Sequence, residues 1–460
     1  MSESKPSKFH ILMFPWFAIG HITPFLHLSN KLAEKGHTIT FLLPAKVQKD
    51  LQHSNLHPNF ITLHPLTIPH VDGLPPGAAT ASDISLSLHH LLVIAMDGTR
   101  DQVELVIKQT KPRLVFYDFS YWIPEITKPL GIKTIFYSVV SAASIAIALV
   151  PARNVQKDKP ITEDELQVPP IGYPSSTVVL RRHEARALSF ISFPFGEGVS
   201  FYIRVTTSMK ECDVISMRTC RETEGNFCDY IASQYNKPVF LTGPVLIEPT
   251  KTPLEDRWVQ WLGGFQPGSV VYCAFGSQYN PKKEQFQELL MGFELTGLPF
   301  LIASRPPIGA PTVEEAFPEG FDERTKGRGV IWGGWIQQPM ILAHPSVGCF
   351  VNHCGFGSMW ESLMSDCQIV LVPQLGDQIL NSRIMAEELK VGVEVEREEN
   401  GWFSKENLCK AIKSVMEEES EVGNLVRKNH AKWKDLLVNP LFANAYIDKF
   451  IKDIQELVGK

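Results

Sequence analysis

The sequence lacks the features that direct proteins into membranes, into the secretory pathway or onto nucleic acid. The N-terminus, MSESKPSKFH, has no apolar signal-peptide core, and no Asn-x-Ser/Thr glycosylation acceptor occurs. The longest apolar run, Val139–Val150, is about half the length of a bilayer-spanning helix. A net charge of -6, without a basic aromatic patch, gives no general attraction to nucleic acid or anionic lipid. We therefore expect a cytoplasmic protein that binds neither nucleic acid nor membranes.

Disulfide and metal-site patterns are also missing. Of the eight cysteines, Cys212, Cys220 and Cys228 recur at a spacing that matches no metal site. We expect the cysteines to be buried free thiols in a reducing compartment. What the chain does have is 460 residues, 44% of them hydrophobic and 20% charged, which indicates a globular protein of two domains.

In the first half of the chain, β-rich runs alternate with amphipathic segments. This alternation, with strands that are apolar throughout, is typical of a parallel α/β sheet covered on both faces. From Pro151 to Ser192 the pattern gives way to Pro-rich, charged sequence, which we interpret as a surface insertion. The predicted strands are Phe9–Phe14, Thr38–Leu43, Phe60–Leu63, Arg113–Tyr117, Ile132–Tyr137 and Val214–Met217, and the predicted helices are Thr23–Glu34, Leu86–Gln109, Ser141–Leu149 and Glu197–Lys210.

The second half repeats the same alternation after a proline-bearing segment. We predict an N-terminal domain over 1–243, a linker over 244–256, and a second domain over 257–440. The predicted strands of the second domain are Val270–Ala274, Phe300–Ala303, Val330–Trp332, Val347–Val351 and Gln368–Val372, and the predicted helices from there to the end are Lys282–Leu295, Met359–Met364, Lys405–Glu418 and Glu421–Lys460.

Polar residues follow several of these strands. His21 and Asp118 come after strands of the first domain, and Ser277 and His353 come after strands of the second. Because ligands of open parallel sheets gather beyond the carboxyl ends of the strands, we expect these four residues to face one cleft.

The stretch Trp335–Gln378 carries the strongest functional signal. Its turn, His353-Cys354-Gly355-Phe356-Gly357-Ser358, joins a strand to a helix, so backbone N–H groups and the helix dipole converge on one point. That geometry predicts a phosphate site. The sequence GFGSMW has a tryptophan where the dinucleotide fingerprint has its last glycine, which disfavours a dinucleotide oxidoreductase.

This stretch resembles the sugar-donor box of plant UDP-dependent glycosyltransferases, glycosyltransferase family 1. The shared features are an opening tryptophan, Gln338, HPSVG, HCG, Ser358, Glu361 and a closing Asp-Gln, together with Gly20-His21 and Asp118 further upstream. The resemblance implies the GT-B fold, in which two Rossmann-like, doubly wound parallel-sheet domains face a cleft. It also implies that a C-terminal helix, 441–460, packs back on the N-terminal domain.

The resemblance further implies a role for each residue of the box. Trp335 would stack on uracil, Gln338 and Glu361 would bind the ribose, and the phosphate turn would hold the diphosphate. The family usually has Trp-Asn where this chain has Phe356-Gly357, so Gly357 offers only its backbone. The implied UDP-sugar site comprises Ser138, Ser277, Trp335, Gln338, His353, Gly355, Phe356, Gly357, Ser358, Glu361, Asp377 and Gln378.

Catalysis by such an enzyme requires a base that deprotonates the acceptor hydroxyl. The resemblance assigns this role to His21, with Asp118 orienting its ring, in a single displacement that inverts the anomeric carbon. The sequence has no Asp-x-Asp motif for a metal on the diphosphate, so we expect neither metal nor other cofactor. Helix-terminus charge and His353 would supply positive potential instead.

Aromatic residues of the first half suit a small-molecule acceptor. Wording such as FPWFAIGH, HVDGLP and HCGFGSMWESL resembles the branch-forming subgroup, whose members extend the sugar of a flavonoid or other glycoside. Transfer to an aglycone is the alternative, and an inactive nucleotide-binding protein is a rival of another class. Glucose is the favoured sugar, with rhamnose or a pentose open, and we expect a monomer. The predicted acceptor residues are Trp16, Phe17, Gly20, Phe119, Trp122 and Phe195.

Overall fold

The computed structural model describes residues 8–157, 159–245, 253–276 and 280–459. The chain forms two compact units. The first contains Met1–Pro174, Leu188–Leu246 and Leu441–Lys460, and the second contains Ser175–Ala187 and Ile247–Pro440. Ser277 and part of the predicted linker lie outside the described residues.

The first unit is built on a parallel sheet whose described strands follow the order β3-β2-β1-β4-β5-β6-β7. These strands are β1 (His10–Phe14), β2 (Thr38–Pro44), β3 (Ile61–Leu66), β4 (Leu114–Tyr117), β5 (Lys133–Ser138), β6 (Val214–Met217) and β7 (Val239–Leu241). Its α-helices are α1 (Ile19–Glu34), α2 (Gln48–Leu51), α3 (His89–Asp97), α4 (Arg100–Thr110), α5 (Ile123–Thr127), α6 (Ala142–Ala148), α7 (Glu163–Gln167), α9 (Phe201–Glu211), α10 (Arg221–Tyr235) and α19 (Pro440–Gly459).

The second unit repeats the architecture with the order β10-β9-β8-β11-β12-β13. Its described strands are β8 (Val270–Ala274), β9 (Phe300–Ala303), β10 (Gly329–Trp332), β11 (Val347–Asn352), β12 (Gln368–Leu371) and β13 (Gly392–Glu394). Its α-helices are α8 (Arg182–Ala185), α11 (Asp256–Leu262), α12 (Lys283–Thr296), α13 (Phe321–Thr325), α14 (Gln338–Leu342), α15 (Phe356–Met364), α16 (Gln378–Arg383), α17 (Lys405–Met416) and α18 (Glu421–Leu437).

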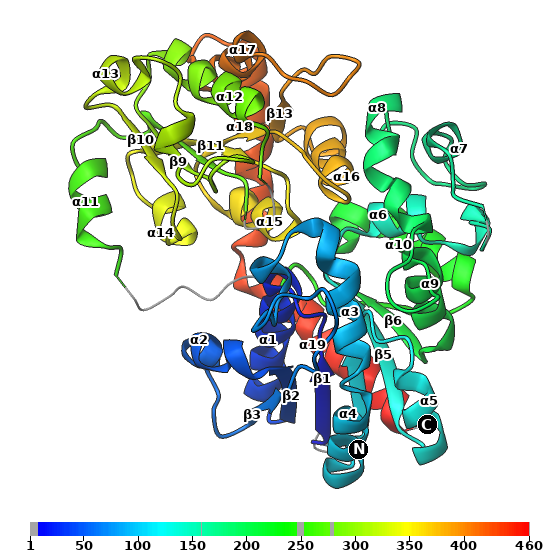
Figure 1. Ribbon diagram of the computed structural model, residues 1–460. Coiled ribbons are helices and arrows are strands. Elements are labelled where there is room, and N and C mark those ends of the chain that lie inside the picture. The colour runs from blue at the N-terminus through cyan, green and yellow to red at the C-terminus, as the bar shows by residue number, and fades with distance from the viewer. Residues whose placement is uncertain (1–7, 158, 246–252, 277–279, 460) are drawn as a thin grey trace. The chain divides into compact units, whose positions relative to one another are not determined.

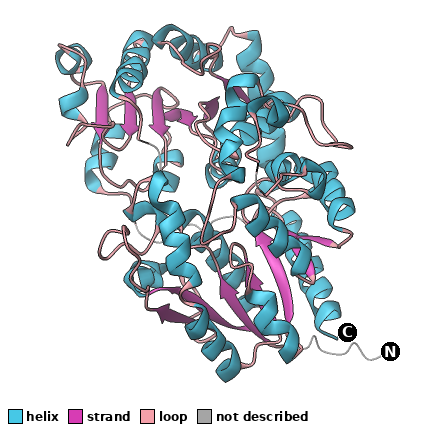
Figure 2. Ribbon diagram, turned by 45° about the vertical axis from the view of Figure 1, so that its right-hand side comes forward, coloured by secondary structure: helices cyan, strands magenta, loops and turns pink. Residues whose placement is uncertain are grey.

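The central strands of both sheets, such as β4 and β8, are buried on both faces, as the continuous apolar strands predict. In β8, Val271 and Cys273 join one hydrophobic cluster while Val270 and Tyr272 join another, so alternate side chains enter separate cores. Figure 2 shows helices on either side of each sheet. The predicted doubly wound parallel α/β fold is confirmed.

Helix α19 completes the core of the first unit although it ends the chain. Its residues Ile447, Phe450 and Ile454 are buried in the same cluster as Phe25 of α1 and Met13 of β1. Figure 1 shows α19 beside α1 on the sheet. Burying such side chains stabilises the unit by roughly 1.5–3 kcal/mol each.

Several predicted element boundaries were wrong for local reasons. The single helix predicted over Leu86–Gln109 is two helices, interrupted at Gly98 and Thr99, where the Thr99 hydroxyl donates to the carbonyl of Met96 at 2.7 Å. Helix α9 begins at Phe201, since the Oγ of Ser200 accepts the N–H of Ile203 at 3.2 Å.

One further predicted helix is divided, and three elements were not predicted. The helix predicted over Glu421–Lys460 is divided before Pro440, which lacks the N–H that would continue α18. The elements that were not predicted are α10 and the short strands β7 and β13.

The segment Ser175–Ala187 packs with the second unit although its neighbours in sequence belong to the first. Glu184 is buried and accepts from Arg383 at the end of α16. Arg383 also donates to Glu394, which in turn accepts from Arg181 at 3.0 Å. Buried charges persist in proteins when they are paired in this way, so the ion-pair network anchors the segment beside α16.

Within the described residues, none of the helices combines the length and apolar character that a bilayer crossing requires. In the same part of the chain, no cluster of three or more His, Cys, Asp or Glu side chains could hold a metal ion. The eight cysteines are free, and seven of them are buried.

Candidate functional site

The topology of both sheets places the predicted functional residues where strand order reverses. In the first sheet the reversal falls between β1 and β4, and His21 and Asp118 follow these two strands. In the second it falls between β8 and β11, and His353 follows β11. Such switch points are where open α/β sheets bind ligands.

His21 and Asp118 form a close pair in the first unit. The Nδ1 of His21 lies 2.7 Å from Oδ2 of Asp118, whose carboxylate is buried, while the imidazole is 17% exposed. A carboxylate only accepts hydrogen bonds, so we assign the proton to Nδ1. The Nε2 of His21 then carries the lone pair that can accept a proton from a substrate.

Aromatic rings surround this pair. The ring of Phe119 lies 5.3 Å from that of His21, and Trp16 lies 5.6 Å from Phe119 and 5.8 Å from Phe195. Phe201 closes the group, at 5.1 Å from Phe195. The structure thus brings three predicted acceptor residues together beside the histidine, and we call Trp16, Phe119, Phe195 and Phe201 the aromatic cluster.

Four further predicted residues of this unit, Phe17, Gly20, Trp122 and Ser138, are not members of the cluster. Phe17 is fully buried and Trp122 nearly so, and each packs against Phe14, at 6.0 and 5.8 Å. Gly20 lies in the first turn of α1, where an added Cβ would meet no atom within 4 Å. Ser138 ends β5, and its hydroxyl donates to the carbonyl of Val140 at 3.3 Å.

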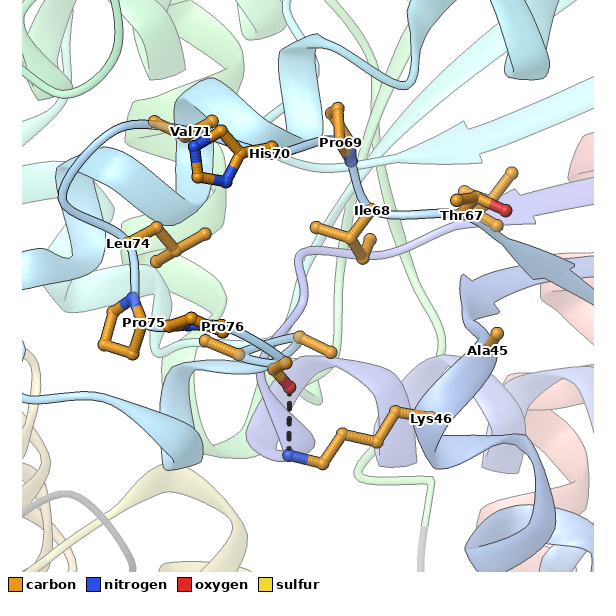
Figure 3. A pocket seen from close by; sticks show the side chains of 14 residues that line it. Ala45, Lys46, Thr67, Ile68, Pro69, His70, Val71, Leu74, Pro75 and Pro76 are labelled. Carbon is orange, nitrogen blue, oxygen red and sulfur yellow. Dashed lines mark hydrogen bonds between the residues drawn. The ribbon is translucent and has the colours of Figure 1, made fainter.

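A pocket of about 450 Å³ opens at the carboxyl ends of β2 and β3. Leucines, prolines and other apolar side chains of the segment 66–79 line it, and Lys46 donates to the carbonyl of Gly77 at 3.2 Å (Figure 3). A hydrogen bond connects the chain just after this segment to the residue that follows Trp16. The N–H of Ala81 donates to the carbonyl of Phe17 at 2.8 Å.

In the second unit, the turn between β11 and α15 has the geometry of an anion site. Gly355 is the N-cap residue of α15, so the free N–H groups of the first turn of the helix follow it. Cys354 adopts a left-handed conformation with φ of 62°, and its N–H donates to Oδ1 of Asn352 at 2.8 Å. A non-glycine residue held in this region indicates a backbone that the surroundings fix firmly.

His353 occupies a space that only glycines leave open. An added Cβ on Gly355 would lie 2.5 Å from its Nε2, and one on Gly276 would lie 2.8 Å from it. Burial lowers the pKa of His353 to about 4, while its contact with the Ala274 carbonyl, 3.3 Å from Nδ1, opposes that shift. A pKa lowered in this way favours the neutral imidazole near pH 7 in the free protein.

Three residues of the predicted nucleotide site hydrogen-bond to one another. Nε2 of Gln338 donates to Oε2 of Glu361 at 2.5 Å and to Oγ of Ser358 at 3.4 Å. The Trp335 side chain is 77% exposed. Trp335 therefore offers an open indole face in the turn that precedes α14, whose first residue is Gln338.

The loop before α16 carries Asp377 and Gln378. Oε1 of Gln378 accepts the N–H groups of Gln374 and Leu375, each at 3.0 Å, which closes the turn. Asn381 was missed by the sequence analysis. It donates to Oδ2 of Asp377 at 3.0 Å and to the carbonyl of Cys354 at 2.8 Å, so it links this loop to the anion turn.

The two residues that depart from the family pattern differ in their surroundings. Phe356 is 5% exposed, with its ring 5.8 Å from that of Trp360. A Cβ added to Gly357 would meet no atom within 4 Å. Ser277, the remaining predicted residue of this site, lies outside the described residues.

Comparison with known proteins agrees with these features. Residues 270–451 match the family model described as UDP-glucoronosyl and UDP-glucosyl transferase. The chain is 58% identical to UDP-glycosyltransferase 79B6 of Arabidopsis thaliana over 453 residues, covering 98% of each chain. It is 59% identical over 461 residues to the anthocyanidin 3-O-glucoside 2'''-O-xylosyltransferase of the same plant, covering 99% of this chain and 98% of the relative.

Solved structures share the fold. The crystal structure of a UDP-glucose: anthocyanidin 3-O-glucosyltransferase in complex with UDP superposes with a TM-score of 0.76 at 21% identity, covering 99% of both chains. At this identity the likeness shows the two-sheet GT-B fold. The matches to the curated relatives extend over 98–99% of the chain. The protein belongs to the plant UDP-dependent glycosyltransferases, enzymes that transfer a sugar from a UDP-sugar.

Proposed function

We propose that the protein transfers a sugar from a UDP-sugar to a hydroxyl on the sugar of a flavonoid or other specialised-metabolite glycoside. The observation that carries this proposal is the 59% identity, over 99% of the chain, to a relative whose name specifies transfer of xylose to an anthocyanidin glucoside. Glucose is our first candidate for the transferred sugar, with xylose, rhamnose and arabinose as the alternatives.

His21 acts as the base in this proposal. Its Nε2 takes the proton of the acceptor hydroxyl as the oxygen attacks the anomeric carbon of the sugar. The bond from that carbon to the UDP oxygen breaks on the opposite side, so the configuration inverts. Asp118, 2.7 Å from Nδ1, stabilises the imidazolium that forms and keeps the ring in the required orientation.

The second unit binds the nucleotide in this account. The exposed face of Trp335 stacks on the uracil, and Gln338 with Glu361 binds the ribose. The N–H groups at the start of α15 hold the diphosphate and stabilise the charge that develops as UDP leaves. Asp377 and Gln378 bind sugar hydroxyls. Ser138 and Ser277 complete the proposed sugar-donor site.

The acceptor binds to the first unit, against the partly exposed rings of Phe119 and Phe195, with Gly20 leaving open space beside His21. Trp16 contacts Phe119 from the buried side, and Phe17 and Trp122 both contact Phe14. Because the helix terminus supplies the electrostatic stabilisation, we propose that no metal takes part. We place the reaction in the cytoplasm and propose that the enzyme acts as a monomer.

A panel of substrates tests the proposal. UDP-glucose, UDP-xylose, UDP-rhamnose and UDP-arabinose are each offered with flavonoid 3-O-glucosides and with the matching aglycones, with and without a chelator. We expect one UDP-sugar to dominate and a glycoside to be the better acceptor, with no effect of the chelator. Product formed only from aglycones would overturn the glycoside assignment, and chelator sensitivity would overturn metal independence.

A further inference from the structure

The guanidinium of Arg204 is fully buried in the first unit and joins three separate segments. Arg204 lies in α9, and its Nη1 and Nη2 donate to the two carboxylate oxygens of Asp97, at the end of α3, at 3.0 and 2.6 Å. Nη1 also donates to the carbonyl of Phe119 at 3.0 Å, and Nε donates to the carbonyl of Phe195 at 2.9 Å. One side chain therefore holds the backbones of two members of the aromatic cluster.

The chemistry of this arrangement requires arginine. A buried cation is stable only when it is paired and hydrogen-bonded, and here Asp97 provides the opposite charge. The planar fork directs N–H groups to a bidentate carboxylate and to two carbonyls at once, which the single ammonium of lysine cannot do. The ring of Tyr121 stacks over the guanidinium at 4.7 Å, and Nε1 of Trp122 donates to Asp97 at 2.8 Å.

The two carbonyls belong to residues whose rings meet edge to face, and the ring of Phe119 lies beside the proposed base. The rings of Phe119 and Phe195 lie 5.8 Å apart, and both contact Trp16. Phe119 follows Asp118 directly, and its own N–H donates to Oδ1 of that carboxylate at 2.6 Å. The position of the guanidinium thus sets the separation of the two rings and, through one peptide unit, the carboxylate that orients His21.

The loop that carries Phe195 has a glycine where the guanidinium of Arg204 lies against its backbone. Gly196 has φ of 105°, and an added Cβ would lie 2.3 Å from Nη2 of Arg204. Gly198, two residues on, also has a positive φ, of 65°, but an added Cβ there would meet no atom within 4 Å. The loop therefore contains one glycine required by the guanidinium and one that is not.

We propose that Arg204 and Asp97 are a positioning pair that sets the shape of the acceptor site. Neither residue touches the reacting atoms; they act through the backbones of Phe119 and Phe195. The proposal rests on the function proposed above, in which the aromatic cluster binds the acceptor. It assigns acceptor selectivity to an ion pair whose arginine is fully buried and whose aspartate is 26% exposed.

The first test compares Arg204→Lys with Arg153→Lys. Arg153 is a buried arginine of the same unit, and its guanidinium donates to the carbonyls of Ile147, Glu165 and Val168, none of which belongs to the cluster. Kinetics with a flavonoid glucoside, UDP affinity by calorimetry, and thermal unfolding are measured for both variants. We expect Arg204→Lys to lower kcat/KM for the acceptor roughly 10–100-fold, chiefly through KM, with UDP affinity unchanged. Arg153→Lys should alter unfolding alone.

The second test moves the guanidinium without removing it. Gly196→Ala should displace Nη2 and raise the acceptor KM in the same direction as Arg204→Lys, whereas Gly198→Ala should leave it unchanged. Both glycines have positive φ, so both variants strain the backbone, and the strain is larger at 105° than at 65°. The acceptor KM, measured beside thermal unfolding, reports the contact with Arg204, which only Gly196 makes. These two variants test whether the position of the guanidinium sets the acceptor KM, even if Arg204→Lys does not fold.

The outcomes separate the inference from the proposed function. If the unaltered enzyme transfers no sugar from any UDP-sugar, the proposed function fails. If it is active but Gly196→Ala and Gly198→Ala share one acceptor KM, the positioning pair is refuted while the proposed function stands. Equal losses of kcat in Arg204→Lys and Arg153→Lys, at unchanged acceptor KM, would show that Arg204 stabilises the fold and does not position the acceptor site.

Discussion

Oδ2 of Asp118 lies 2.7 Å from Nδ1 of His21, while Oδ1 of the same carboxylate accepts the N–H groups of Trp16 and Phe119 at 2.7 and 2.6 Å. A single buried carboxylate therefore fixes both the imidazole and the backbone of two residues of the aromatic cluster. The orientation of the proposed base and the shape of the proposed acceptor site depend on one group.

Replacing His21 with alanine should nearly abolish transfer, by roughly 10²–10⁴-fold, because the acceptor hydroxyl loses its base. UDP affinity should not change, since the nucleotide contacts proposed above lie in the second unit. Initial rates and calorimetry with UDP measure the two effects. His57→Ala, a histidine distant in sequence from the cluster, serves as the control. Substantial turnover by the alanine variant would show that another group is the base.

Asp118→Asn should separate catalysis from folding. The amide oxygen can still accept from Trp16 and Phe119, but the amide NH₂ would face Nδ1 of His21. The imidazole must then carry its proton on Nε2, where the base has to accept one, so the rate should fall by up to about 10⁴-fold.

Asp118→Ala is the companion variant. It leaves two buried N–H groups without their acceptor and should destabilise the fold by about 1–3 kcal/mol. Denaturant unfolding compares the two variants. An asparagine variant as active as the parent enzyme would contradict the assigned tautomer.

Trp335→Ala should weaken UDP binding without affecting stability. Its ring is 77% exposed, so little packing is lost, whereas stacking on uracil contributes about 0.5–1.5 kcal/mol, or roughly 2–12-fold in Kd. Calorimetry with UDP and a thermal unfolding curve test both parts. Equal affinity in the two proteins would exclude stacking, and a large loss of stability would show that the ring packs in solution.

The affinity for UDP-glucose should rise as the pH falls from 7 to 5. Burial lowers the pKa of His353 to about 4 in the free protein, and a nearby diphosphate favours the imidazolium and raises it. The complex then binds more protons than the free protein between these pKa values, so acid favours binding. Calorimetric titrations in buffers of different ionisation enthalpy measure the number of protons taken up on binding. His353→Gln should remove this proton uptake, and a pH-independent affinity in the parent enzyme would show that His353 does not lie near the bound diphosphate.

Gly357→Asn should fold normally and change the preference among UDP-sugars. An added Cβ meets nothing within 4 Å, and asparagine restores the polar side chain that the family usually has there. Gly355→Ala is the contrast, because its Cβ would lie 2.5 Å from His353 and should lower UDP affinity. The ratio of kcat/KM values across UDP-sugars measures the first effect. An unchanged ratio would show that residue 357 does not face the sugar.

The sequence predicted the parallel sheets well because apolar strands and amphipathic helices are local patterns. The pairing of His21 with Asp118 followed from strand ends and from the family resemblance. Ion pairs between residues far apart in the sequence have no such local pattern, so they were not predicted. Arg204 and Asp97 are 107 positions apart, and Glu184 and Arg383 are 199 apart.

For some residues, the contacts or the protonation state could be assigned only from the tertiary structure. Asn381 is one turn of helix beyond Asp377, but only the tertiary structure shows that it reaches Cys354. The neutral state of His353 depends on burial, and sequence position gave no measure of that. The open space at Gly357 likewise could not be read from a one-residue departure from the family pattern.

The most direct test of the account is the structure of the product. A flavonoid 3-O-glucoside and the preferred UDP-sugar are incubated with the enzyme and, in parallel, with the His21→Ala variant, and the product is examined by NMR. We expect a new bond between two sugars, an anomeric configuration opposite to that of the UDP-sugar, and almost no product from the variant. A retained configuration, or a sugar attached to the flavonoid ring, would contradict it.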